Sequence, residues 1–169
     1  INPPTVSVNN VEEYDGTNWT TGGTLNTARQ DMGAAGIQTN ALVFSGRVSP
    51  PGSTSTATEL YDGTSWNTTA NVSTGRSQGA GAGTVANGLF FGGSLGVQTE
   101  EFTTSIYSPI AATWASGGNM VNTLRGRASG GLQTASIAAG GEAPRTADTE
   151  LYDGTSWSEV NNLNTARNQ

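Results

Sequence analysis

The sequence contains no cysteine and no histidine, and these two absences exclude a large part of protein chemistry. Without cysteine the chain cannot form disulfides or thiolate metal sites. Without either residue it lacks the usual ligands of zinc, copper and haem iron. A Ser-His-Asp arrangement is impossible as well. We therefore expect no metal, no other cofactor and no catalytic activity.

Positive charge is scarce. There is no lysine, so all seven basic residues are arginine, and thirteen acidic residues give a net charge of −6. An acidic surface repels phosphate backbones, so we expect no nucleic-acid partner. No apolar run reaches the roughly 18 residues that a membrane-spanning helix needs, so we expect no membrane insertion.

Large apolar residues are few. Hydrophobic residues make up 34% of the chain, beside 24 glycines and long stretches of Thr, Ser and Asn. Such a composition taken alone is typical of disordered or low-complexity chains. The few large side chains recur at fixed places, however, and this order predicts a folded repeat protein.

The repeat is built around a phrase that ends in tryptophan. Its four copies read EEYDGTNW (12–19), ELYDGTSW (59–66), SIYSPIAATW (105–114) and ELYDGTSW (150–157). They align Tyr14, Tyr61, Tyr107 and Tyr152, and likewise Trp19, Trp66, Trp114 and Trp157. A second phrase after each tryptophan supplies Arg29, Arg76, Arg125 and Arg167. The period is about 47 residues, which is typical of architectures that stack one small unit per repeat.

Within one period the local signals all indicate β-structure. Asp-Gly pairs supply the positive φ that tight hairpin turns require. Glycine-rich segments such as GAGAG (79–83) suit a strand that is crowded against other backbones. We expect an all-β chain with four strands per period, which in the second copy fall near 32–38, 41–46, 57–62 and 65–70.

Four antiparallel strands in a repeat of roughly 40–50 residues are typical of a propeller blade. The order Arg, Gly-Gly, Glu-x-Tyr-Asp, Trp resembles the kelch repeat, with glycine pairs at Gly92–Gly93 and Gly140–Gly141. The phrases also resemble kelch-like repeats in virion and tail proteins of marine bacteriophages.

The resemblance implies a kelch-type β-propeller with about 3.5 four-stranded blades. One partial propeller domain would cover 1–169, with a half blade over 1–25 and blades over about 26–72, 73–120 and 121–163. Because an open arc leaves bare sheet faces, we expect this chain to be part of a larger ring that is completed by further blades or other chains.

Each blade has few large side chains, so we expect one Tyr and one Trp per repeat to provide much of the packing. We expect both rings to point at the next blade. The repeated arginine can lie over an aromatic face or pair with the repeated glutamate. These positions are interpreted as structural.

The loops between second and third strands differ between copies, over 47–56, 94–103 and 142–148. Binding residues tend to lie on variable loops that a rigid scaffold holds. We expect these loops to cluster on one face and to display five binding candidates, namely Arg47, Glu100, Glu101, Glu142 and Arg145. The alternative is that they are only surface connections.

Three functional hypotheses follow. The favoured one is a non-catalytic structural or adhesive display module in a virion (phage tail, fibre or capsid decoration) or another extracellular assembly. Its partners would be other protein chains and surface glycans, and its location extracellular or in a virion. The alternatives are a lectin-like, carbohydrate-binding propeller and an intracellular kelch adaptor for protein partners.

Overall fold

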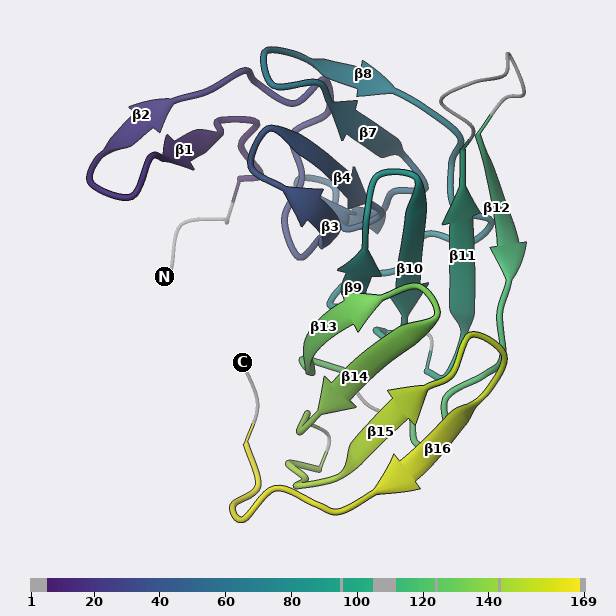
Figure 1. Ribbon diagram of the computed structural model, residues 1–169. Coiled ribbons are helices and arrows are strands. Elements are labelled where there is room, and N and C mark those ends of the chain that lie inside the picture. Colours follow the sequence, from purple (N-terminus) through teal and green to yellow (C-terminus); the bar gives the residue numbers. More distant parts are fainter. Residues whose placement is uncertain (1–5, 95, 105–111, 124, 143, 168–169) are drawn as a thin grey trace.

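The computed structural model describes residues 6–94, 96–104, 112–123, 125–142 and 144–167. Within these ranges the chain forms sixteen β-strands and no helix (Figure 1). The prediction of an all-β chain is confirmed. Three four-stranded antiparallel sheets follow one another along the sequence, and each uses strands in chain order.

A half blade and three complete blades share the chain. Blade 1 contains only β1 (Glu12–Tyr14) and β2 (Trp19–Thr21). Blade 2 contains β3 (Gly33–Ile37), β4 (Asn40–Phe44), β7 (Thr58–Tyr61) and β8 (Trp66–Thr68). Blade 3 contains β9 (Ala80–Gly83), β10 (Asn87–Phe91), β11 (Thr99–Thr103) and β12 (Thr113–Ser116). Blade 4 contains β13 (Ala128–Leu132), β14 (Ala135–Ala139), β15 (Thr149–Tyr152) and β16 (Trp157–Val160).

The blades lie around an arc that is open between blade 1 and blade 4 (Figure 1). This is a β-propeller-like arrangement, and the described residues do not close a ring. In blade 2 the four strands fall within the ranges that the sequence predicts, apart from the first residue of β4. The sequence did not predict the small hairpin of β5 (Arg47–Val48) and β6 (Ser53–Thr54), which lies in the loop between β4 and β7.

The backbone conformation repeats with the blades. Just before each first strand one residue has a positive φ, and these residues are Asp31 (57°), Gln78 (59°) and Gly126 (61°). Just after each second strand another residue has a positive φ, and these residues are Ser45 (59°) in blade 2, Gly92 (64°) in blade 3 and Gly140 (67°) in blade 4. Such φ values are unusual for residues other than glycine. Because they occur at the same place in each blade, they align the copies independently of the side chains.

The first strands β3, β9 and β13 line the inner side of the arc (Figure 1), and β9 packs against both of the others. The approach is close enough that a Cβ atom added at Gly81 would overlap the backbone oxygen of Ala34. Small residues here let the inner strands meet backbone to backbone, as the sequence predicts.

The hydrophobic core is divided into layers between blades. One cluster joins blades 2 and 3 and contains Leu42, Phe44, Val72, Phe90 and Phe102. The other joins blades 3 and 4 and contains Ala82, Leu89, Phe91, Met120, Ala138, Tyr152 and Trp157. Each sheet therefore depends on its neighbour to bury its apolar side chains.

Trp114 and Trp157 pack against the preceding blade, whereas the sequence interpretation pointed the tryptophans at the next one. The ring of Trp157 lies 4.6 Å from Phe91, and its Nε1 donates to Thr99 Oγ1 at 3.0 Å. Trp114 lies 5.3 Å from Phe44 and donates to the Ala70 carbonyl oxygen. Trp19 has no preceding blade among the described residues and is 66% exposed, against 6% for Trp157.

The third copy uses a phenylalanine where the others use tyrosine. Phe102 is paired with Trp114 in the register that pairs Tyr61 with Trp66 and Tyr152 with Trp157. The sequence pattern assigned this position to Tyr107, which lies outside the described residues. The segment TEEF lies in the third strand of blade 3, so Phe102 is the residue paired with the tryptophan of that blade.

We predict that Gly81→Ala destabilises the protein by about 1–3 kcal/mol, because inserted atoms force the packed inner strands apart. Gly130→Ala is the matched control, since a Cβ there has no heavy atom within 4 Å. Denaturant unfolding of both variants measures the difference. Equal losses of stability would contradict the close approach of β9 to β3.

Candidate functional site

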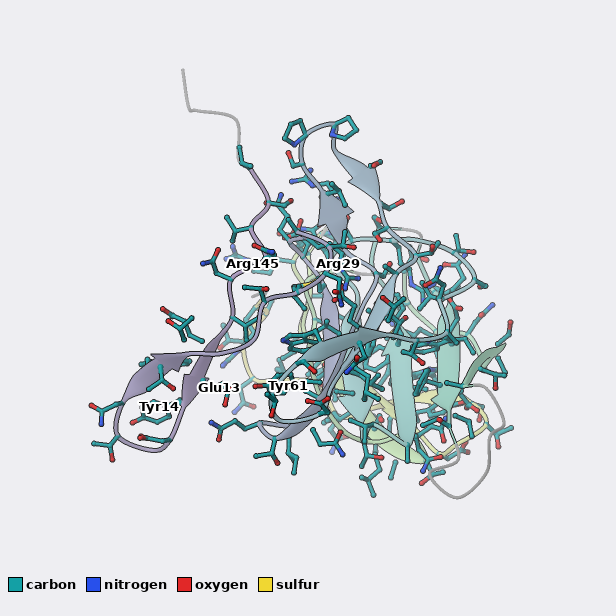
Figure 2. The ribbon with its side chains drawn as sticks, turned by 90° about the horizontal axis from the view of Figure 1, so that it is seen from above. Glu13, Tyr14, Arg29, Tyr61 and Arg145 are labelled. Carbon is teal, nitrogen blue, oxygen red and sulfur yellow. The ribbon has the colours of Figure 1, made fainter. Side chains whose placement is uncertain are left out.

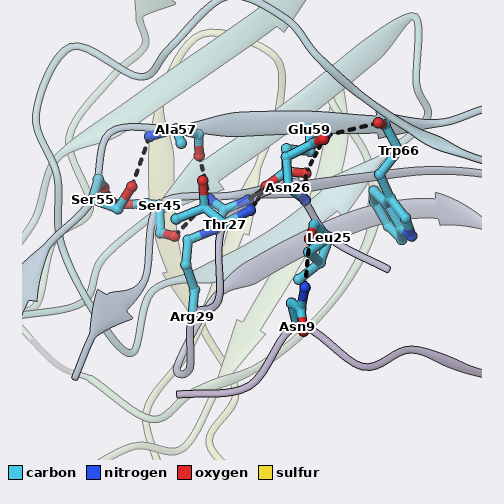
Figure 3. Close-up of polar contacts among 10 residues, drawn as sticks. All are labelled: Asn9, Leu25, Asn26, Thr27, Arg29, Ser45, Ser55, Ala57, Glu59 and Trp66. Atoms are coloured by element: carbon cyan, nitrogen blue, oxygen red, sulfur yellow. Dashed lines mark hydrogen bonds and ion pairs between the residues drawn. The ribbon is translucent and has the colours of Figure 1, made fainter. Parts of the chain in front are cut away.

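A buried ion pair connects the third strand of blade 2 to the segment that enters the blade (Figure 3). Arg29 Nη2 donates to Glu59 Oε1 at 2.7 Å, and Glu59 Oε2 accepts from the backbone N–H of Asn26 at 2.6 Å. Arg29 Nη1 also donates to the carbonyl oxygen of Ser45 at 3.0 Å. The two charged side chains are 0% and 1% exposed. We call this arrangement the Arg–Glu clamp.

The clamp is repeated in blades 3 and 4. Arg76 pairs with Glu100 at 2.8 Å, and Glu100 also accepts from the Ser73 N–H. Arg127 pairs with Glu150 at 2.7 Å, and Glu150 also accepts from the Val121 N–H. In each blade one carboxylate therefore holds an arginine and the backbone of the incoming segment.

Burial lowers the pKa of the Arg29 and Arg76 guanidinium groups, and the paired carboxylates Glu59 and Glu100 oppose this effect. A guanidinium titrates from so high a value that it stays protonated in a protein. Arg76 in addition lies over the Phe90 ring at 3.9 Å, so both predicted roles of the repeated arginine are present in one residue.

Two of the predicted repeat arginines differ from this pattern. Arg125 is not a clamp residue: its side chain is 46% exposed and lies 3.5 Å from Glu142, while Arg127 reaches the buried position. The number of residues between the clamp arginine and the first strand differs between copies. Aligning the repeated sequence phrases therefore selected Arg125 in place of Arg127. Arg167 is exposed, and its Nε donates to the Thr165 carbonyl oxygen at 3.5 Å.

Two of the five predicted loop candidates are not in a loop. Glu100 and Glu101 lie in β11, where Glu100 is the buried clamp carboxylate. Glu101 Oε1 accepts the hydroxyl proton of Tyr152 at 2.6 Å, across the interface between blades 3 and 4. Aligning TEEF (99–102) with TELY (58–61) and TELY (149–152) would have placed them correctly.

The repeated tyrosines reach the preceding blade. Tyr152 donates to Glu101, and in the same way Tyr61 donates to Glu13 Oε1 (Figure 2). Burial, followed by the hydrogen bond to Glu101, raises the pKa of Tyr152 to about 12. The hydrogen bond to Glu13 raises the pKa of Tyr61.

The Asp-Gly turns are structural, as the sequence predicts. Asp62 Oδ1 accepts from the backbone N–H groups of Thr64 and Ser65 at 2.9 and 2.8 Å, and Gly63 has φ of 92°. These hydrogen bonds lower the pKa of Asp62. Asp15 and Asp153 accept the equivalent bonds. Each turn carboxylate is thereby engaged by its own hairpin.

The entering segments and the loops between second and third strands lie at one end of the arc, which we call the loop end. There the backbones of Gln30 and Arg47 pair, as do those of Arg125 and Glu142. A pocket of about 210 Å³ opens between them, and its lining includes Asp31, Gln78, Gly126 and Glu142. The three positive-φ positions of consecutive blades thus contribute to one pocket.

Charged side chains at the loop end are engaged only loosely. Arg47 Nη2 lies 3.9 Å from Asp31 Oδ2, with the side chains 41% and 37% exposed. Arg145 is exposed in the loop over 140–148. Exposed ion pairs of this kind contribute little stability, so these groups can exchange their partners for a ligand at small cost. Of the five predicted candidates the loop end therefore contains three, Arg47, Glu142 and Arg145.

Neither a metal cluster nor a membrane-spanning helix is found in the part of the chain that the structure describes. No three His, Cys, Asp or Glu residues there are grouped so that they could hold a metal ion. No described helix is long and apolar enough to cross a bilayer.

Comparison with known proteins identifies the fold. No family model matches the chain, and no curated protein matches it. Among solved structures, YjhT superposes with a TM-score of 0.75 and 12% identity, over 95% of this chain and 64% of that one. The chain therefore spans slightly less than two thirds of the YjhT chain. At this identity the similarity concerns the fold alone, and together with the successive four-stranded sheets it defines a β-propeller-like protein.

We predict that Arg127→Ala lowers the free energy of unfolding by about 3–5 kcal/mol, because it leaves the Glu150 carboxylate buried and uncompensated. Arg125→Ala, two residues away, should cost no more than about 1 kcal/mol. Chemical denaturation of the two variants measures both values. The clamp would be misassigned if Arg125→Ala proved the more damaging change.

Tyr152 should titrate well above an ordinary tyrosine. Its pKa is raised from 10.0 to about 12, so the stability that its neutral form contributes is complete below pH 10 and is lost as the pH rises toward 12. Ultraviolet absorbance of the phenolate should contain a component that appears toward pH 12 and that Tyr152→Phe removes. If Tyr152→Phe instead removed absorbance that appears near pH 10, the contact with Glu101 would be contradicted.

Proposed function

We propose that this chain is a non-catalytic segment of a kelch-type β-propeller that displays binding loops at its loop end. The assembly would be a virion, as a tail, fibre or capsid-decoration component, or another extracellular particle. The observation that carries the proposal is the separation of charges into two sets. One set is buried and repeated in every complete blade. The other is partly or fully exposed and lies on the variable loops of the loop end.

The buried set serves the framework. Arg29, Arg76 and Arg127 are each paired with a glutamate of the same blade and are at most 2% exposed in their side chains. A group so enclosed cannot meet a substrate without unfolding the blade around it. Catalysis by the buried acids and bases is therefore not part of the proposal.

The exposed set has the character of a recognition surface. Arg47, Glu142 and Arg145 come from loops that differ in length and sequence. Glu142 also lines the pocket of about 210 Å³ at the loop end, together with Asp31 and Gln78. A rigid scaffold holds these loops, which lowers the entropy cost of binding. Surface proteins and glycans are the ligand classes that such a surface can bind.

The kelch assignment rests on the phrase order and on the clamp. The complete blades share Arg, Glu and Trp, with Gly-Gly in blades 3 and 4 and Tyr in blades 2 and 4. They use the Arg and Glu for the clamp and the aromatic rings for packing. The virion setting rests on the phrase resemblance to phage proteins.

A second candidate is a carbohydrate-binding propeller. The pocket lining of carboxylates and an amide, from Asp31, Gln78 and Glu142, offers donors and acceptors for sugar hydroxyl groups. Its volume of about 210 Å³ suits one small ring more than an extended chain. A third candidate is an intracellular adaptor that binds a protein through the same loops.

Mass spectrometry of intact particles from the source tests the setting. We expect the chain in stoichiometric amounts in purified virions or in another extracellular assembly. Recovery only from cell interiors, bound to a protein, would replace the proposal with the adaptor.

The loop end is tested by a combined variant, Arg47→Ala, Glu142→Ala and Arg145→Ala. We expect binding to the particle surface or to an arrayed glycan to fall at least about tenfold, with stability changed by less than about 1 kcal/mol. A glycan signal that this variant abolishes would select the lectin.

The matched control lies at the opposite end of the blades, where a second pocket is lined by residues including Asn87 and Thr134. Asn87→Ala with Thr134→Ala should leave binding unchanged. If the control loses binding and the loop-end variant keeps it, the binding face is the wrong one.

A further inference from the structure

Two positions on the third strands form a matched pair at each interface between blades. The first is the ring position, occupied by Tyr61, Phe102 and Tyr152. The second belongs to the preceding blade and is occupied by Glu13, Leu60 and Glu101. Tyr61 donates to Glu13 and Tyr152 donates to Glu101, whereas Leu60 packs against the cluster that contains Phe102.

The pairing follows from hydrogen-bond satisfaction. A phenol buried between two sheets needs an acceptor, and the glutamate supplies it. Phe102 offers no donor, and the equivalent residue of the preceding blade, Leu60, is apolar and packs against the cluster that contains Phe102. Polar matches polar and apolar matches apolar at all three interfaces in the described chain, although the residues of each pair are about one period apart in sequence.

The outer face of blade 4 carries the second position without its partner. Ile137 is paired with Leu151 in the same register that pairs Leu42 with Leu60. Leu42 is 0% exposed beneath blade 3, whereas Ile137 and Leu151 are each 42% exposed. A hollow of about 240 Å³ lies over them, bordered by Gly130. This face has the form of a blade interface whose other half is not present.

We propose that the outer face of blade 4 binds a further four-stranded blade with an apolar ring, of the Phe102 type, at its ring position. The proposal rests on the propeller assignment in the proposed function and adds the chemistry of the missing neighbour. The residue that seats on Leu151 is a phenylalanine or an equivalent apolar side chain, because Leu151 cannot accept a hydrogen bond from a phenol.

A second copy of this chain is not the matched occupant. Its free end is blade 1, where Tyr14 is at the ring position and is 45% exposed beside Trp19. Docking that end on blade 4 would place Tyr14 against Leu151, which offers no carboxylate of the kind that Tyr61 and Tyr152 meet on their preceding blades. The Tyr14 hydroxyl instead donates to the Gly16 carbonyl oxygen of its own hairpin at 2.9 Å.

The test extends the full chain after Arg167 with a second copy of residues 77–120, which supplies one more blade of the Phe102 type. It is compared with the same extension carrying Phe102→Tyr in the added copy. Each extension is made with and without Leu151→Glu in blade 4, which completes a double-mutant cycle.

With Leu151 present, we expect the phenylalanine extension to have the smaller unfolding equilibrium constant, by about tenfold. With Leu151→Glu, the tyrosine extension should be the more stable one. Backbone hydrogen exchange in β14 and β15 should be slower in the phenylalanine extension than in the unextended chain. The same order of stability on both backgrounds, or no added protection, would overturn the proposal.

Two further measurements separate the possible causes of failure. The cycle of Tyr152→Phe and Glu101→Leu measures the same coupling at an interface that is already formed, so a zero coupling there would refute the pairing rule itself. Sedimentation of the unextended chain should show no head-to-tail association. An association that both Leu151→Ala and Trp19→Ser abolish would be head-to-tail. Such association would make a second copy the occupant. None of these measurements involves loop-end binding, so a failure of the display function would leave their outcome unchanged.

Discussion

A buried carboxylate on the third strand of each complete blade fixes the segment by which the chain enters that blade, and the other features of the structure depend on this contact. Glu59, Glu100 and Glu150 each accept from an arginine and from backbone N–H groups of the incoming segment. A buried ion pair adds little net stability over an apolar replacement, but it penalises every arrangement that leaves one charge unpaired. The clamp therefore selects one connection between successive blades.

With the connections fixed, a sparse set of large side chains is enough to fill the spaces between sheets. Phe44, Phe91, Trp114 and Trp157 contribute to two aromatic layers, one at each interface between complete blades. The same arrangement explains why equivalent residues differ in exposure. Trp157 is covered by blade 3, whereas Trp19 belongs to blade 1, which has no described neighbour on that side. The exposure of a repeated tryptophan therefore depends on whether a described blade precedes it in the arc. Such exposure does not by itself indicate a ligand site.

The division of charge connects the fold to its use. The clamp arginines are enclosed, and the three turn aspartates are engaged by backbone N–H groups at the opposite end of the blades. Only the loop end combines exposed charges of both signs with loops that vary from blade to blade. Variation there is tolerated because the inner strands and clamps hold the blades independently of the loops.

The sequence by itself determined the period, the all-β character, the four strands of the second copy and the structural role of the Asp-Gly turns. These features are local: an Asp-Gly pair or an alternating strand has the same meaning wherever it stands in the chain. It also identified arginine, glutamate and the aromatic rings as the residues of the repeat.

Tertiary structure decided which particular residues meet. It selected Arg127 over Arg125 and placed Glu100 in the core and not in a loop. It also put Phe102 in the ring position and turned Trp114 and Trp157 toward the preceding blade. The physical reason is that a change of one or two residues in offset leaves a phrase recognisable but moves a side chain to another partner or another face. Contacts between segments tens of residues apart depend on that offset, and a single sequence contains no measure of it.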